Sequence, residues 1–116
     1  MGIPELLTNL EFVGRAEGDK RTYYVFKGRR QYVVASANRE GLNLNVVAGE
    51  APEVILKKFG GKRVTNTILG KNGRRPDLFG QSFQRLNSLY VMVALGKARK
   101  LKEREGKAMV FKIALH

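Results

Sequence analysis

The side chains best able to make directed hydrogen bonds gather between residues 81 and 107. Amide, hydroxyl and guanidinium groups recur on the polar side of a predicted helix, at Gln81, Gln84, Arg85 and Ser88. Glutamine can pair with an adenine edge and arginine with a guanine edge, each through two hydrogen bonds, so these side chains are suited to contact bases. A merely solvated helix face would show the same residues, and taken alone that interpretation is the better one.

A dense basic run follows this helix and moves the interpretation towards nucleic acid. Its lysines and arginines are suited to neutralise phosphates: Arg99, Lys100, Lys102, Arg104 and Lys107. Two shorter basic segments accompany it, a Gly-containing loop with Arg29 and Arg30, and a predicted flexible loop over 70–75 with Lys71, Arg74 and Arg75. For Arg29 and Arg30, a phosphate contact and simple solvation fit the sequence equally well.

The charge of the chain is high and unevenly distributed. Its 116 residues carry a net charge of +12. Residues 1–58 hold 9 basic and 7 acidic side chains, whereas residues 59–116 hold 13 and 3. Solubility alone does not require such concentration, which is typical of proteins that bind a polyanion through counterion release. We therefore expect a polyanionic partner, with nucleic acid first. An acidic protein or an anionic membrane surface would also fit the charge, but no long amphipathic helix with a basic face is evident, so a membrane ranks lower.

Several other chemistries are disfavoured by the residues present. The chain has no cysteine, and its one histidine is the last residue, His116, so we expect no metal site and no Ser-His-Asp catalysis. Gly61-Lys62 is followed by Arg63 rather than Ser or Thr, so no phosphate-binding enzyme loop is formed. The sequence predicts a protein that is not an enzyme and needs no cofactor. No apolar stretch approaches the ~20 residues of a membrane span, and we expect a cytoplasmic protein with no membrane partner.

The pattern of the chain predicts one α+β domain over residues 1–116. A short helix is expected over 3–10. A β-rich part over 12–48 contains a hairpin (21–26 with 31–36) and a third strand (42–47), because β-branched and aromatic residues alternate between Gly-containing turns. Aromatic residues near the basic loop of that hairpin could stack on bases, but Tyr24 and Phe26 are interpreted as packing the core or shielding a sheet face. A helix then begins near Pro52 and ends at Gly60-Gly61.

A longer helix is expected to begin at Pro76 and to reach residue 90. Apolar residues recur along it at spacings of three and four, which is typical of one buried face: Phe79, Phe83, Leu86, Tyr90 and Val93. The stretch 90–95 is apolar on all sides and could be helix or a central strand. A basic hairpin over 97–113 follows, with its turn at Glu105-Gly106-Lys107.

The order of elements from Pro52 to Leu115 resembles that of the winged helix-turn-helix DNA-binding proteins. The resemblance implies a unit over 52–115 whose helix 76–90 enters the major groove, with Gln81, Gln84, Arg85 and Ser88 facing bases. It also implies that the basic hairpin follows the phosphate backbone, and it makes duplex DNA the first expected partner, with RNA second. A small transcriptional regulator or DNA-maintenance factor would follow from this resemblance. The N-terminal sheet would then complete the core or form a homodimer contact.

Two alternatives remain open at this point. The segment Gly70-Lys71-Asn72-Gly73 resembles the Gly-x-x-Gly loop of KH domains, which joins two helices and clamps a single-stranded backbone. That resemblance implies RNA binding at loop 70–73 and a strand over 90–95. The other alternative is a non-enzymatic subunit that docks an acidic protein partner, in which case binding would not depend on DNA or RNA.

Overall fold

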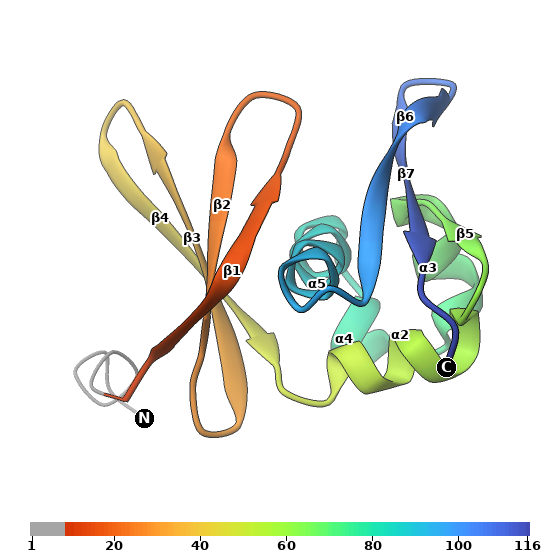
Figure 1. Ribbon diagram of the computed structural model, residues 1–116, viewed down its shortest axis with the longest axis horizontal. Coiled ribbons are helices and arrows are strands. Elements are labelled where there is room, and N and C mark those ends of the chain that lie inside the picture. Colours follow the sequence, from red (N-terminus) through yellow and green to blue (C-terminus); the bar gives the residue numbers. More distant parts are fainter. Residues whose placement is uncertain (1–8) are drawn as a thin grey trace.

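The first part of the chain is an antiparallel sheet. The computed structural model describes residues 9–116, so the helix expected over 3–10 lies largely outside the described residues. The sheet is a meander with the order β1-β2-β3-β4 (Figure 1), formed by β1 (Glu11–Glu17), β2 (Thr22–Lys27), β3 (Gln31–Asn38) and β4 (Gly41–Ala48). The predicted hairpin and third strand are confirmed, and a further strand, β1, precedes them in the sheet.

Helices and a smaller sheet form the rest of the molecule. They follow in the order α2 (Ala51–Phe59), β5 (Arg63–Val64), α3 (Asn66–Gly73), α4 (Pro76–Phe79), α5 (Ser82–Ala94), β6 (Ala98–Glu105) and β7 (Ala108–Ile113). The second sheet is antiparallel with the order β5-β7-β6. The mixed α+β class, with an antiparallel sheet first and helices after it, is thereby confirmed.

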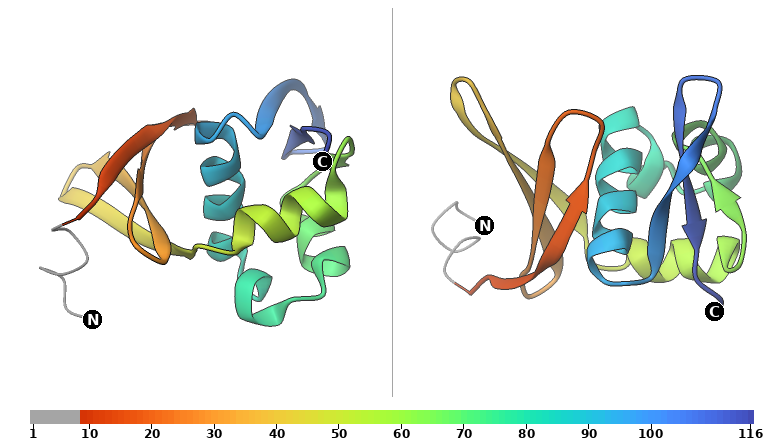
Figure 2. Two further views of the ribbon diagram at one scale, coloured as in Figure 1. Left: turned by 60° about the horizontal axis from the view of Figure 1, so that its bottom comes forward. Right: turned by 45° about the horizontal axis from the view of Figure 1, so that its top comes forward.

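Helix α5 lies between the two sheets and carries the centre of the core (Figures 1 and 2). Its residues Leu89 to Met92 are at most 2% exposed. The ring of Tyr90 stacks on Tyr23 of β2 with centroids 4.1 Å apart, and it meets Phe111 of β7 edge-on at 6.3 Å. Burial raises the pKa of the Tyr90 hydroxyl. The stretch 90–95, which could have been a strand, is therefore helical through Ala94. It is apolar on all sides because a sheet covers the helix on each side.

The two faces of the first sheet have different surroundings. The inner face packs on α5 through Ala16, Val25, Val34 and Val47, all buried. The outer face, formed by the alternate residues, exposes large apolar side chains: Phe12, Tyr24, Leu42, Leu44 and Val46. Tyr24 and Phe26 lie on this outer face, since they pair with Ala35 and Val33. Of the two interpretations given above, they therefore shield a sheet face and do not pack in the core.

The expected long helix from Pro76 to residue 90 is wrong, because the chain breaks between α4 and α5. Gln81 is extended (φ −120°, ψ 150°) and forms a capping box with Gln84, whose side-chain oxygen accepts a hydrogen bond from Gln81 N at 2.9 Å. This capping box satisfies backbone N–H groups at the start of α5 that a continuous helix would have paired internally. The break also changes the helical phase, so Phe83 leaves the expected buried face and is 52% exposed.

The expected flexible loop over 70–75 is wrong for its first part, since α3 extends through Gly73. Thr65 caps this helix, and its hydroxyl accepts a hydrogen bond from Ile68 N at 3.2 Å. Gly73 is buried, and a Cβ on it would lie 2.8 Å from the Phe79 ring. The Gly-x-x-Gly segment is therefore helical and packed. Residues 90–94, which the KH resemblance implied to be part of a strand, belong to helix α5.

Candidate nucleic-acid interface

The four side chains expected to face bases are largely engaged within the protein. Ser88 is 1% exposed, and its hydroxyl donates a hydrogen bond to Gln84 O at 2.7 Å. Gln84 and Gln81 cap α5 as described above. Arg85 is half-buried, and its guanidinium donates to Asn66 Oδ1 at 2.6 Å and to Phe79 O at 2.9 Å. The expectation that Ser88 lies on a base-contacting surface is wrong, and the other three side chains serve the local structure.

The reason is that the first sheet covers the middle of α5. Strand β1 lies so close to the end of α5 that a Cβ on Gly14 would be 2.8 Å from Ala94 O. Residues Asn87 to Met92 of the helix are all buried. The exposed side chains of α5 are Ser82 and Phe83 in its first turn, and the other residues of the helix are buried or half-buried.

A basic hollow lies at the junction of α3, α4 and α5. It measures about 350 Å³. Its charged lining residues are all cationic and are called here the basic cluster: Lys71, Arg74, Arg75 and Arg85. Glycine at position 70 lets the helix approach the Arg85 side chain, because a Cβ there would lie 3.1 Å from its guanidinium carbon. The structure thus brings together residues that the sequence placed on a loop and on a helix.

Arg74 has an unusual backbone conformation within this cluster. Among residues 9–116 it is the one non-glycine residue with a positive φ, at 54°. It follows α3 directly, a position where glycine is usual because its lack of a Cβ removes the steric cost. The left-handed turn directs the chain into α4 and leaves Arg74 exposed. Within the described residues no acidic side chain forms an ion pair with Arg74, so its charge is available to an anion.

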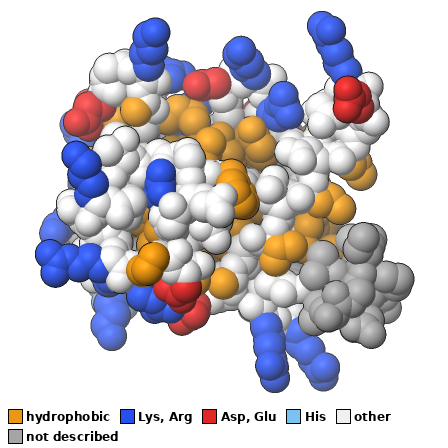
Figure 3. All heavy atoms as spheres, turned by 180° about the vertical axis from the view of Figure 1, so that it is seen from behind, with side chains coloured by type: hydrophobic (Ala, Val, Ile, Leu, Met, Phe, Trp, Pro, Cys, Tyr) orange, Lys and Arg blue, Asp and Glu red, His pale blue; other side chains and the backbone are white. Residues whose placement is uncertain are grey.

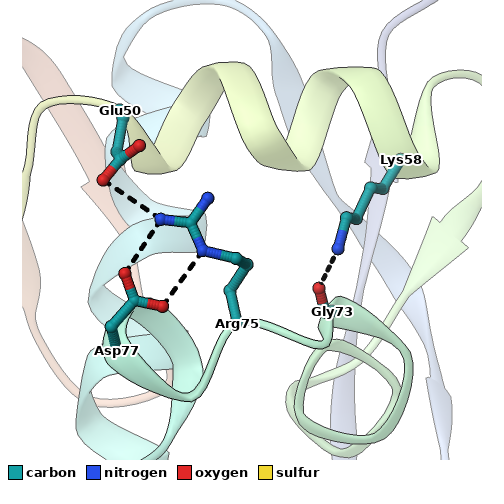
Figure 4. Close-up of polar contacts among 5 residues, drawn as sticks. All are labelled: Glu50, Lys58, Gly73, Arg75 and Asp77. Carbon is teal, nitrogen blue, oxygen red and sulfur yellow. Dashed lines mark hydrogen bonds and ion pairs between the residues drawn. The ribbon is translucent and has the colours of Figure 1, made fainter.

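Arg75, by contrast, is a structural cross-link (Figure 4). Its guanidinium donates to both carboxylate oxygens of Asp77, at 3.0 and 2.8 Å, and to Glu50 Oε1 at 3.1 Å. These bonds join the start of α4 to the start of α2. Asp77 raises the pKa of the Arg75 guanidinium, and Arg75 in turn lowers the pKa of Asp77. Nearby, Lys58 donates to Gly73 O and satisfies a carbonyl at the end of α3.

The β2–β3 turn adds further positive charge next to this cross-link. Arg29 and Arg30 are exposed in the turn, which Gly28 N closes by donating to Gln31 O at 2.7 Å. Lys27, Arg29, Arg30 and Glu50 line a second hollow of about 340 Å³. Because Glu50 also binds Arg75, the turn and the basic cluster flank the same ion pair. Seen from behind, Lys and Arg side chains stand along several margins of the molecule, whereas acidic ones are few (Figure 3).

The basic hairpin expected from the sequence is present as β6 and β7, but its charges are partly neutralised. Arg104 donates to both oxygens of Asp19 and to Lys107 O, and Lys100 Nζ lies 3.7 Å from Asp19. Three of the predicted phosphate ligands are exposed and form no ion pair within residues 9–116: Arg99, Lys102 and Lys107. In Figure 1 the β6–β7 turn and the β2–β3 turn lie at opposite ends of the view, so the hairpin forms a second basic surface.

The sequence offers no signal for the acidic residues that organise these surfaces. Asp19 is visible there only as a turn residue, yet it binds a strand 85 residues further along the chain. The hydrogen bond from the Arg104 side chain lowers the pKa of the Asp19 carboxyl. Glu50 and Asp77 resemble ordinary first-turn acids, although both hold Arg75. Such contacts depend on tertiary placement, which no local spacing encodes.

Two kinds of site are absent from the part of the chain that the structure describes. Residues 9–116 hold no group of three or more His, Asp or Glu side chains placed to share a metal ion. No helix in the same range is long and apolar enough to cross a membrane.

Comparison with known proteins gives no relative from which a function could be carried over. No family model matches the chain, and no curated protein or solved structure matches it either. The candidate site therefore rests on the geometry and charge described above.

Proposed function

We propose that this protein binds duplex DNA through its phosphates and contacts bases little. The observation that carries the proposal is the basic cluster, a hollow whose charged lining residues are all cationic and where Arg74 is held exposed at positive φ. Left-handed conformations in non-glycine residues cost free energy and are concentrated at functional sites. A small anion alone would not account for the additional cations of the β2–β3 turn and the C-terminal hairpin.

Low sequence preference follows from the position of α5. The order α2-β5-α3-α4-α5-β6-β7 is compatible with the winged-helix resemblance, and regulation of transcription or DNA maintenance would follow by analogy with that class. The helix that such proteins insert into the major groove is here covered by β1. Phosphate contacts position a protein on DNA and carry no sequence information directly. We therefore propose a role in which position on the DNA is set by shape or by a partner.

Duplex rather than single-stranded nucleic acid is favoured by the placement of the aromatic rings. Single-strand binders stack bases on exposed aromatic side chains within a cationic groove. Phe12 and Tyr24, which are 56% and 42% exposed, lie on the outer face of the first sheet. The one aromatic residue of the basic hollow, Phe79, is 2% exposed. Phe83 of α5 is 52% exposed but does not line the hollow, so no exposed aromatic ring lines the basic hollow.

The test is binding of the full chain to labelled duplex DNA, single-stranded DNA and RNA of equal length over a range of salt concentrations. Several duplexes of different sequence are included. The proposal predicts the tightest binding to duplex DNA, with similar affinity for every duplex. A strong preference for one sequence, or for RNA, would contradict it. No binding at low salt would reject nucleic acid as the partner and leave the acidic protein.

A further inference from the structure

The edges of the two sheets differ in how they are protected against pairing with another strand. Exposed edges carry unpaired backbone groups, and proteins usually protect them with charges, bulges or short strands. Strand β1 has a bulge between Phe12 and Gly14 and carries Glu11, Arg15 and Glu17. Strand β6 has an irregularity between Lys100 and Arg104 and is highly charged. Strand β5 has only 2 residues.

Strand β4 is the edge without any of these protections among residues 9–116. Its 8 residues, Gly41–Ala48, include no charged residue and no proline. Its pairing with β3 is regular from Gln31–Ala48 to Asn38–Gly41. Leu42, Leu44 and Val46 are 73%, 43% and 50% exposed. An uncharged edge of this length with an exposed apolar outer face is unexpected in a chain whose net charge is +12.

The hydrogen-bond register shows which backbone groups of β4 point outwards. Gly49 N donates to Arg30 O at 2.9 Å, so the pair Arg30–Gly49, next after Gln31–Ala48, is a hydrogen-bonded pair. Hydrogen-bonded and non-bonded pairs alternate along an antiparallel ladder. Val47, Asn45 and Asn43 therefore bond to β3. Leu42, Leu44 and Val46 direct their N–H and C=O groups away from it, and their side chains lie on the outer face.

We propose that two copies of this chain pair through β4, antiparallel, about a two-fold axis at Leu44. In this register Leu44 lies opposite Leu44 of the second copy, and Leu42 lies opposite Val46. Each of these is an outward-directed pair that can exchange both backbone hydrogen bonds. The two four-stranded sheets become one continuous sheet. The apolar outer faces join as well, because residues directly opposite in a ladder share a face.

A second copy suits this edge better than any other occupant for two reasons. An antiparallel pair of identical strands about a two-fold axis is self-complementary, as a homodimer interface must be. An acidic partner would be drawn to the cationic surfaces, and β4 offers it no charge. Two copies with a net charge of +12 each repel one another least where they meet through uncharged residues. In Figure 1 and in the right-hand view of Figure 2 the β3–β4 hairpin projects on the side away from the C-terminal hairpin.

Disulfide trapping tests both the pairing and its register, since the chain has no cysteine of its own. In the proposed dimer the two Leu44 Cα atoms are about 5.5 Å apart, within the range that a disulfide spans. Leu44→Cys should therefore form a covalent dimer on mild oxidation. The two Leu42 positions are separated by about 13 Å along the strands, so Leu42→Cys should not. Trapping by Tyr24→Cys in place of Leu44→Cys would overturn the edge pairing in favour of stacked outer faces.

The mass in solution, measured over a concentration series up to millimolar, provides the second test. Wild-type protein should reach twice the 13.0 kDa of the chain. Leu44→Lys should shift the equilibrium to monomer, because two lysines would lie directly opposite one another. The matched control is Ala37→Lys, which adds the same charge to the same face of β3, one strand inside the edge. Monomeric wild-type protein throughout the series, or a Leu44→Lys variant that is folded by circular dichroism and still dimeric, would overturn the proposal.

Discussion

Replacing Arg74 with glycine separates the proposed function of this residue from its structural cost. A left-handed backbone costs a residue with a Cβ roughly 1–2 kcal/mol, and glycine removes that cost. Glycine also loses about 0.5–1 kcal/mol more in chain entropy on folding. The expected net effect of Arg74→Gly is a stabilisation of about 0–1.5 kcal/mol, which raises Tm by up to about 8 °C for a domain of this size.

The same substitution is expected to weaken binding to DNA. It removes one exposed cation from the basic cluster and leaves Lys71 and Arg85 in place. The slope of log affinity against log salt should become less steep by about 0.9, the contribution of one neutralised phosphate. Thermal unfolding and a salt titration on the same preparations measure both effects. A protein that becomes more stable and binds less well is the expected outcome, and it is an outcome that misfolding cannot produce.

Arg39→Gly is the matched control for charge. Arg39 is exposed in the β3–β4 turn, far from the α3–α4–α5 junction, and its φ is not positive. The control removes one positive charge and should leave the salt slope unchanged. An equal decrease of the slope in both variants would mean that net charge alone determines binding. A fall in Tm for Arg74→Gly would refute the left-handed assignment, and an unchanged slope would refute a phosphate contact at Arg74.

Three other changes test the capping of α5, the core and the contact between Asp19 and Arg104. Gln84→Ala removes the capping box and should lower the free energy of unfolding by about 0.3–1.5 kcal/mol in a denaturant titration, with no change in preference among duplexes; a changed preference would restore Gln84 as a base contact. Tyr90→Ala opens the core between the two sheets and should cost about 3–5 kcal/mol, measured by the same titration, and a cost below about 1 kcal/mol would contradict the burial of that ring. Because Arg104 lowers the folded-state pKa of Asp19 below its unfolded value of about 3.9, their ion pair stabilises the protein above that pH, and this stabilisation disappears as the pH falls through the lower folded-state pKa. The decrease in Tm between neutral pH and about pH 3 should therefore be smaller in Asp19→Asn than in wild type, and an identical decrease would show that the ion pair with Arg104 does not contribute.

Elements with local signals could be predicted from the sequence. The β2–β3 hairpin follows from alternating β-forming residues around Gly28, and α2 from Pro52 at its start and Gly60-Gly61 at its end. Thr65 could be identified as a helix cap because a hydroxyl at that position satisfies a free N–H of the first turn. These features depend on neighbours within a few residues, so the sequence contains the information needed.

The break between α4 and α5 shows where that reasoning fails. Apolar residues continue at helical spacing from Phe79 through Phe83, although the chain turns at Gly80 and Gln81. Periodicity reports which residues can share a face but not whether the backbone is continuous between them. The capping box of Gln81 and Gln84 is visible in the sequence only as two polar residues three apart. Capping a helix and contacting a base require the same side chains, so the sequence does not distinguish the two uses.

The candidate site was predictable in composition but not in arrangement. Every residue of the basic cluster is a predicted phosphate ligand or base contact, since charge is visible in the sequence. Coverage of α5 by β1 was not predictable, because the close approach of Gly14 to Ala94 joins residues distant in the chain. Because this approach covers α5, we propose contacts with the phosphate backbone in place of the base contacts that the sequence predicted.

The decisive measurement is a salt titration of duplex DNA binding for wild-type protein and for the double variant Lys71→Glu/Arg74→Glu. We expect a steep linear dependence of log affinity on log salt for the wild type. For the variant we expect a slope less steep by about 0.9 for each phosphate that it no longer neutralises, while Arg39→Glu retains the wild-type slope. A double variant that binds duplex DNA with the wild-type slope would show that the basic cluster is not the nucleic-acid interface.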